Sequence, residues 1–197
     1  MAIKKELILD FAGVLATNFS PFFWQELSEE SKTSYEMLVQ FKKEIREELW
    51  TGKVSEGEFW AQLCKQFPAI KRDKAKAILI SNIKPLPAIR EVATWSEYAN
   101  IHIVSNHRIE WIQPIIKPIE SYVRSITISS QVGYCKPESE IFTLVKMQLS
   151  NECNVLFVDD QEKNFKEAKE LGWNTLLADE NGNWIERIIP LISQLQT

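Results

Sequence analysis

The chain has 197 residues, of which 45% are hydrophobic and 25% charged, and its formal net charge at pH 7 is -4. This length accommodates one sizeable core with an insertion, or two small domains. The acidic balance argues against a nucleic-acid-binding protein, whose affinity normally depends on a basic face. No apolar run approaches the length of a membrane span, so we expect neither nucleic acid nor a membrane among its partners.

The start of the chain and its cysteines predict a cytoplasmic protein. Residues 1–5 lead directly into the first predicted strand and leave no room for a secretory signal ahead of it. The three cysteines, Cys64, Cys135 and Cys153, are an odd number at wide spacing. We therefore expect reduced thiols rather than a disulfide framework or a metal site.

Short apolar runs alternate with helical patterns along most of the chain. The predicted strands are residues 6–10, 101–105, 126–129, 155–159 and 174–178. The predicted helices of the same region are residues 87–98, 109–122, 138–149, 162–171 and 184–195. Pro114 and Pro118 should kink or split the second of these helices, and Pro190 should kink or break the last. The alternation predicts an α/β fold, with a Rossmann-like parallel sheet and helices on both faces.

The gap between the first two strands is much longer than the others and contains no convincing strand. Apolar residues recur every four positions over residues 36–50, which predicts a helix. Ser55 and Glu58 form a plausible capping box ahead of a second apolar stripe, and residues 74–81 offer a third helical stretch. We expect a helical insertion over the carboxyl edge of the sheet. The predicted domains are a core of residues 1–16 and 83–197 and a helical cap of residues 17–82.

Polar side chains stand at four points where a predicted strand ends or a predicted helix begins. These points are Asp10, the pair Ser105 and Asn106, Lys136, and the pair Asp159 and Asp160. Each of them alone is common as a turn former or helix cap. Their joint occurrence is informative, because the carboxyl ends of parallel strands gather at one edge of a sheet, where such folds bind ligands.

The chemistry of these groups is complementary. A desolvated aspartate such as Asp10 is a competent nucleophile toward phosphorus and forms an aspartyl-phosphate. Asp10 and Asp160 would repel each other unless a cation lay between them, which suggests Mg²⁺. The Ser105 hydroxyl and the Asn106 amide can donate to phosphate oxygens. Lys136 supplies a positive charge that reduces the repulsion between an anionic nucleophile and an anionic substrate.

On these residues the chain resembles the haloacid dehalogenase-like (HAD) hydrolase superfamily, from Leu7 to about Leu177. The resemblance implies that Asp10 is the nucleophile, that Ser105 and Lys136 belong to the second and third motifs, and that Asp160 is the principal acidic metal ligand. It also implies that Asp159 is a neighbouring ligand or outer-shell group, with Asn164 as an outer-shell partner. The segments 133–142 and 158–168 carry the most specific part of the match.

The cap region narrows the resemblance to one branch of the superfamily. Residues 49–60 look like the cap of the branch that contains sugar-1-phosphate phosphatases and the N-terminal phosphatase domain of epoxide hydrolases. This similarity implies a Mg²⁺-dependent phosphatase that acts on a small phosphorylated metabolite.

Position 12 departs from the family pattern. Most phosphatases of the superfamily have an aspartate there, which protonates the leaving alcohol, whereas this chain has Ala12. General acid catalysis contributes roughly 10²–10⁴-fold, so we expect slow turnover of simple alkyl phosphates. The main-chain carbonyl of Ala12 can still ligate magnesium, as the family's residue at that place does, and Gly13 keeps the tight turn.

Several explanations of Ala12 stay open. Some helical-cap phosphatases have a small residue there and take the proton from water or the substrate. Haloacid dehalogenases need no proton for a halide, and Lys136 would then help to bind a carboxylate. A third explanation is a catalytically silent binding or regulatory protein that retains the fold. Phosphonoacetaldehyde hydrolases also have alanine there, but they need a cap lysine, for which Lys53 is the candidate.

Two further side chains have simpler interpretations. His107 has a pKa near neutrality when unperturbed and is a candidate proton donor, although a partly exposed loop residue is the simpler expectation. Lys42, together with Lys43, is expected on a solvated helix face.

Overall fold

The computed structural model describes residues 4–150, 154–179 and 181–195. Five strands form one parallel sheet in the order β3-β2-β1-β4-β5. The strands are β1 (Lys5–Leu9), β2 (Ala99–Ser105), β3 (Val123–Ile128), β4 (Val155–Asp159) and β5 (Asn174–Leu177). All five predicted strands are present, with starts displaced by up to three residues, and the predicted parallel α/β sheet is confirmed.

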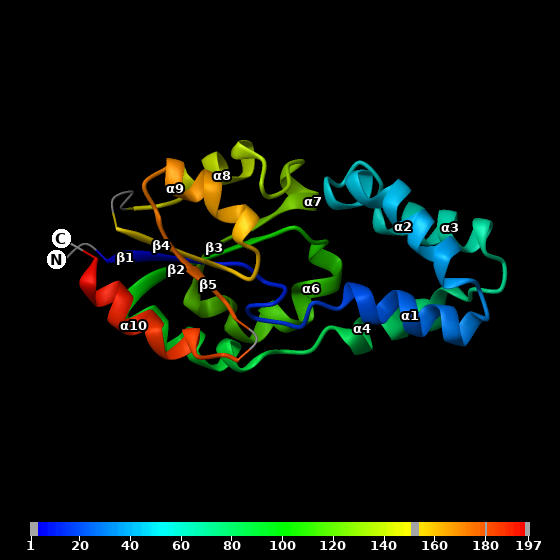
Figure 1. Cartoon of the computed structure of the whole chain (residues 1–197), viewed down its shortest axis with the longest axis horizontal. Helices are drawn as coiled ribbons and strands as arrows, with labels where there is room; N and C mark the ends of the chain where they lie inside the picture. The colour runs from blue at the N-terminus through cyan, green and yellow to red at the C-terminus, as the bar shows by residue number, and fades with distance from the viewer. Residues whose placement is uncertain (1–3, 151–153, 180, 196–197) are drawn as a thin grey trace.

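The central strands are apolar because both faces of the sheet are buried. In β1, Leu7 and Leu9 belong to one core cluster while Ile8 belongs to the other, as the two-residue period of a strand requires. One face is covered by α5 (Val92–Tyr98), α6 (Ile109–Ile116) and α10 (Trp184–Gln194). The opposite face is covered by α8 (Ser139–Lys146) and α9 (Phe165–Glu170) (Figure 1).

Short elements complete the core, and the prolines within its helices have different effects. The short elements are η1 (Pro87–Glu91), η2 (Lys117–Tyr122), α7 (Ser129–Val132) and η3 (Glu162–Asn164). The predicted helix 109–122 is split at Ile116, because η2 follows with Pro118 in its first turn. Of the kink or break predicted at Pro190, the break is wrong: α10 continues through Pro190, with Trp184, Ile188 and Ile192 buried along one face.

Four helices lie beyond the carboxyl ends of the strands (Figure 1). They are α1 (Ser20–Ser31), α2 (Tyr35–Trp50), α3 (Glu56–Gln66) and α4 (Arg72–Asn82). The capping box of α3 is confirmed, since the amide of Glu58 donates to Ser55 Oγ and the amide of Ser55 donates to Glu58 Oε2. Their arrangement is consistent with the proposed cap of residues 17–82. No helix in the described ranges is long and apolar enough to cross a bilayer.

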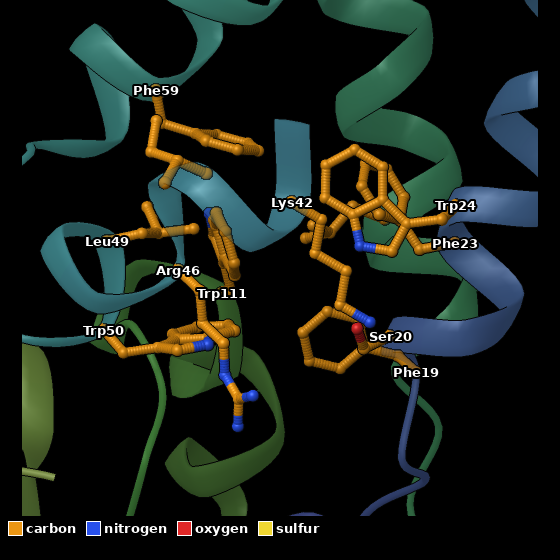
Figure 2. Close-up of a pocket in the computed structure, with 12 residues that line it drawn as sticks. Phe19, Ser20, Phe23, Trp24, Lys42, Arg46, Leu49, Trp50, Phe59 and Trp111 are labelled. Atoms are coloured by element: carbon orange, nitrogen blue, oxygen red, sulfur yellow. The ribbon is translucent and has the colours of Figure 1, made fainter. Parts of the chain in front are cut away.

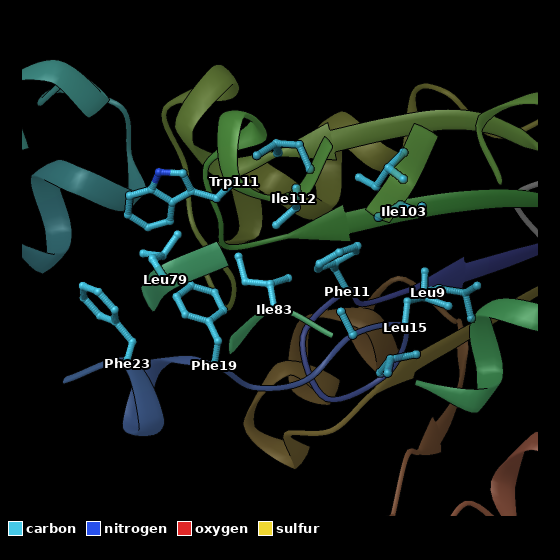
Figure 3. Packing of buried hydrophobic residues seen from close by; sticks show 14 of the residues in the cluster. Leu9, Phe11, Leu15, Phe19, Phe23, Leu79, Ile83, Ile103, Trp111 and Ile112 are labelled. Atoms are coloured by element: carbon cyan, nitrogen blue, oxygen red, sulfur yellow. The ribbon is translucent and has the colours of Figure 1, made fainter. Parts of the chain in front are cut away.

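A continuous apolar cluster joins these four helices to the sheet. The Phe19 ring packs edge-on against Trp111 of α6, with ring centroids 6.2 Å apart, and Figure 3 shows Phe11 and Leu9 continuing the cluster toward the sheet. The loop after α2 also touches the core closely, because a Cβ on Gly52 would lie 2.0 Å from the Ser130 carbonyl oxygen. The four helices are therefore held over the sheet edge by two contacts, the apolar cluster around Trp111 and the approach of Gly52 to Ser130.

Candidate active site

The loop after β1 delivers a carboxylate to the middle of the sheet edge. Asp10 follows β1 directly, and its amide donates to the Val158 carbonyl oxygen of β4 at 2.9 Å. The chain then turns sharply, and the Phe11 carbonyl oxygen accepts hydrogen bonds from later amides of the loop. Gly13 has φ +82°, and a Cβ there would lie 2.4 Å from Asp160 Oδ2. The turn therefore requires glycine, and it brings the β1 loop against the β4 loop.

Asp10 and Lys136 form a buried ion pair. Asp10 is 5% exposed, and its Oδ1 accepts from Lys136 Nζ at 2.8 Å and from the Phe11 amide at 2.6 Å. No described residue donates to Asp10 Oδ2. The second carboxylate oxygen is therefore left for a ligand or for attack on a substrate.

Asp159 holds the other side of the Lys136 ammonium. Lys136 Nζ lies 2.6 Å from Asp159 Oδ2, and Asn164 Nδ2 lies 2.9 Å from both Asp159 oxygens. The Gln161 amide also donates to Asp159 Oδ1. With these donors around it, Asp159 is suited to orienting Lys136. The Asp160 side chain is half-buried and receives a long 3.4 Å hydrogen bond from Gln161 Nε2.

Three carboxylates share a single ammonium group at this point. Oxygens of Asp10, Asp159 and Asp160 all lie within 4.8 Å of one another. Burial raises the pKa of Asp10 to about 7; the Lys136 ammonium opposes this rise, and the carboxylates of Asp159 and Asp160 add to it. Burial lowers the pKa of Lys136, but the carboxylates of Asp10 and Asp159 outweigh it and hold that pKa above its usual value. The excess negative charge and the oxygen donors fit a hard divalent cation.

The backbone of the β1 loop offers one more oxygen. The hydrogen bonds that close this loop use the carbonyl oxygens of Phe11 and Ala16, and no described donor reaches that of Ala12. Its availability is consistent with the predicted role of Ala12 as a main-chain ligand.

Ser105 and Asn106 end β2 beside the ion pair and have different environments. Ser105 is fully buried, and its Oγ has no hydrogen-bond partner in the described ranges. Both ends of the Asn106 side chain are engaged by Lys136: Nδ2 donates to its carbonyl oxygen at 2.8 Å, and Oδ1 accepts from its amide at 2.7 Å. In this structure the Asn106 side chain therefore positions the Lys136 backbone, and the second N–H of its Nδ2 has no partner among the described residues, so its role toward phosphate oxygens stays a prediction.

A cavity of about 280 Å³ opens over these groups. Five of the predicted site residues line it: Asp10, Ala12, Ser105, Asn106 and Lys136. Cap residues of α1 and α2 form part of the wall opposite them. Among these are partly buried Lys42, which was expected only on a solvated helix face, and exposed Arg46, which was not singled out from the sequence. Their i, i+4 spacing, which places both on one face of α2, is the signal that could have found them.

His107 is buried rather than partly exposed. Its ring lies 5.1 Å from the rings of Phe19 and Trp50, and its Nδ1 has no hydrogen-bond partner in the described ranges. Burial, followed by the nearby Lys136 ammonium, lowers the pKa of His107 to about 3. The imidazole is therefore neutral near pH 7, which removes the imidazolium as a proton donor there.

The cap lysine considered for a Schiff base lies away from the cavity. The Lys53 side chain is 62% exposed and pairs with Glu47 at 3.3 Å, and Lys53 is not among the cavity residues. This placement gives no support to phosphonoacetaldehyde chemistry.

Comparison with known proteins gives one sequence relative and several structural ones. No protein-family model matches the chain. A D-ribitol-5-phosphate phosphatase from Bacteroides thetaiotaomicron is 26% identical over 161 residues, which are 76% of this chain and 78% of that protein.

Solved structures share the fold along the whole chain. A protein from Porphyromonas gingivalis described as a predicted HAD-like family hydrolase has a TM-score of 0.77 at 18% identity, covering 98% of this chain and 100% of that one. A HAD family enzyme from Bacteroides thetaiotaomicron, in complex with magnesium and inorganic phosphate, has a TM-score of 0.70 at 21% identity over 92% and 97% of the two chains. A dehalogenase structure has a TM-score of 0.66 at 18% identity, with both chains covered completely.

Proposed function

We propose that this chain, which has the fold of haloacid dehalogenase-like hydrolases, is a Mg²⁺-dependent phosphatase acting on a small phosphorylated metabolite through an aspartyl-phosphate. The observation that carries the proposal is the Asp10 carboxylate, which Lys136 holds through one oxygen while the other has no protein donor. The phosphatase from Bacteroides thetaiotaomicron supports this choice among the activities known on the fold.

The residues of the site supply the nucleophile and the charge-stabilising groups for a two-step displacement. Asp10 Oδ2 attacks phosphorus in line with the departing alkoxide, so that an O–P bond forms at Asp10 as the ester O–P bond breaks. The Lys136 ammonium and the Ser105 hydroxyl stabilise the negative charge on the phosphoryl oxygens. Water then cleaves the aspartyl-phosphate, which releases inorganic phosphate and regenerates the Asp10 carboxylate.

Magnesium fits the donor set of the same loops. Asp10, Asp160 and the Ala12 carbonyl oxygen would hold it directly, with Asp159 as an outer-shell group. A bound Mg²⁺ offsets the charge of the carboxylates and that of the transferring phosphoryl group. Asp159 meanwhile keeps Lys136 oriented, and Gly13 keeps the Asp160 loop close.

The proton for the leaving group must come from outside the usual position. Ala12 has no group that titrates, and His107 is neutral at neutral pH. Water or a hydroxyl of the substrate therefore supplies the proton. Departure of the alkoxide therefore limits the rate, and substrates with good leaving groups should be hydrolysed faster.

Phosphate release with and without metal tests the proposal. We expect release that needs Mg²⁺ and stops with a chelator, and a loss of about 10³-fold or more in Asp10→Asn, because the nucleophile is removed. Asp73→Asn is the matched control, since Asp73 is exposed on α4. Equal rates in Asp10→Asn and Asp73→Asn would refute Asp10 as the nucleophile.

A 2-haloacid dehalogenase-type hydrolase is the second candidate. Ala12 favours it, because a halide leaves without a proton, and a dehalogenase shares the fold. This candidate predicts halide release from 2-haloacids without added metal, and the absence of halide from every haloacid tested would remove it. If neither phosphate nor halide is released, a binding or regulatory protein is the remaining explanation.

A further inference from the structure

The cavity over Asp10 holds more positive charge than the proposed chemistry uses. Besides Lys136, its wall contains Lys42 and Arg46 of α2 and Lys163 of η3. Asp10 is the only carboxylate among the lining residues. This concentration of cations stands out in a chain whose formal net charge is -4.

These three cations have no carboxylate partner in the part of the chain that the structure describes. No ion pair joins Lys42, Arg46 or Lys163 to an acidic side chain. The acidic neighbours on α2 are engaged elsewhere, since Glu44 accepts from Gln40 and Glu47 pairs with Lys53. Lys136, by contrast, already has Asp10 and Asp159.

Lys42 and Arg46 are close enough to repel each other. Burial, followed by the Arg46 guanidinium, lowers the pKa of Lys42. Figure 2 shows an adjoining pocket that shares these two cations with the cavity over Asp10; in it the Lys42 ammonium lies beside Ser20 and the Arg46 guanidinium extends past the Trp50 ring. Like charges at i and i+4 destabilise a helix, and no ion pair with a carboxylate of the described residues offsets that repulsion here. An anion in the cavity would relieve it.

We propose that Lys42 and Arg46 bind a second anionic group of the substrate, a carboxylate or a second phosphate, at the end remote from the phosphoryl group that is transferred. This inference rests on the proposed phosphatase function and names its substrate class. The transferred phosphoryl group is bound by Lys136 and Ser105, so the cations of α2 remain for the other end. Lys163, on the core side of the cavity, adds a third positive charge.

The size of the cavity limits the substrate further. Its volume of about 280 Å³ lies just below the range of roughly 300–1,000 Å³ typical of small-molecule sites. The volume therefore favours a short substrate, and the cations of α2 favour an anionic group at its remote end, as in a phosphorylated hydroxy acid or a small bisphosphate.

Matched substrates test this inference. Ribitol 5-phosphate and ribonate 5-phosphate differ only in a hydroxymethyl or carboxylate group at the remote end, and ribulose 1,5-bisphosphate carries a second phosphate there. We expect kcat/KM to be at least about 10-fold higher for ribonate 5-phosphate or ribulose 1,5-bisphosphate than for ribitol 5-phosphate. The better of the two substrates shows whether the remote anionic group is a carboxylate or a phosphate.

Cap variants show whether α2 carries that preference. Lys42→Gln and Arg46→Gln should each reduce the ratio of kcat/KM between the anionic and neutral substrates by about 10-fold, mainly through KM. Lys43→Gln is the matched control, because Lys43 is exposed on the same helix and does not line the cavity. A ratio near one in the unmodified protein, or equal ratios in Lys42→Gln and Lys43→Gln, would overturn the proposal.

Binding separates this inference from the phosphatase proposal. Calorimetric titration of Asp10→Asn with the three phosphates in the presence of Mg²⁺ needs no turnover. Tighter binding of an anionic-end compound, lost in a variant that also carries Arg46→Gln, supports the second anion site even if no phosphate is released. Equal affinity for all three compounds refutes it, while phosphate release in the unmodified protein would leave the phosphatase proposal standing.

Discussion

At the residue scale, the proposed phosphatase lacks a proton donor at position 12, and the consequence of Ala12 for the leaving group can be tested directly. Acetyl phosphate and p-nitrophenyl phosphate should be turned over faster than glycerol phosphate at the chemical step, because their leaving groups need less protonation. Ala12→Asp should raise the rate on glycerol phosphate by about 10² while changing that on acetyl phosphate little. Single-turnover kinetics measures both. Equal rates on all three substrates, or equal gains in the variant, would show that proton donation does not limit the reaction.

His107 should make the protein less stable in mild acid. Its folded-state pKa of about 3 lies below the ordinary value of 6.5, so between these values the unfolded chain binds more protons and stability falls as pH falls. At pH 5 the cost is about 2 kcal/mol. Urea unfolding measures the free energy of unfolding at pH 7 and at pH 5. Its decrease between these pH values should be about 2 kcal/mol larger in the unmodified protein than in His107→Gln. Between pH 8 and pH 9, where His107 is deprotonated in both the folded and the unfolded state, the free energies of unfolding of the two proteins should change equally, and equal changes between pH 7 and pH 5 would contradict the assignment.

Residues that follow a strand end could be located in the site from the sequence. Contacts with distant parts of the chain could not be predicted in this way. Asp10, Lys136 and Ser105 share one cavity, as the strand-end argument predicts. Asn106 is different, because its partner is the main chain of Lys136, thirty positions away. His107 was misjudged for a similar reason: Phe19 and Trp50, which bury it, come from the helical insertion.

At the scale of elements, the loop between α2 and α3 depends on Gly52. This residue has φ +75°, and a Cβ would lie 2.0 Å from the Ser130 carbonyl oxygen, a backbone atom that cannot move aside cheaply. Gly52→Ala should lower the free energy of unfolding by about 2 kcal/mol or more. The measurement is urea unfolding.

Gly57 provides the matched control for that substitution. It lies inside α3, where a Cβ would meet no atom closer than 3.9 Å, so Gly57→Ala should stabilise the protein by up to about 1 kcal/mol. Opposite signs for the two substitutions are the expected result. A neutral Gly52→Ala would show that the loop does not approach α7 as described.

Helices with a clear apolar spacing were predictable, whereas α1 was not. Its aromatic run Phe22–Trp24 hides the four-residue spacing of Phe23 and Leu27, and Phe19 at its N-cap makes no side-chain cap hydrogen bond. Pro21 in the first turn was the available signal. α10 shows the reverse case, since its buried face outweighs the helix-breaking tendency of Pro190.

At the scale of the whole molecule, the strand order explains why the site is where it is. β1 lies between β2 and β4. In the order β3-β2-β1-β4-β5, β2 and β3 are added on one side of β1 and β4 and β5 on the other, so the strand order reverses between β1 and β4. The carboxyl ends on either side of such a reversal leave a crevice, which in this protein lies between Asp10 and the Asp159–Asp160 pair. The sequence predicted parallel strands, but pairing between strands about 150 residues apart could not be derived from local patterns.

A crystal structure with Mg²⁺ and beryllofluoride, a mimic of a phosphoryl group, tests the central claim most directly. The account predicts beryllium bonded to Asp10 Oδ2, with a metal ion in contact with both Asp10 and Asp160 and with Lys136 and Ser105 donating to the fluorides. A mimic bound to another residue, or a metal ion that leaves Asp10 untouched, would contradict it.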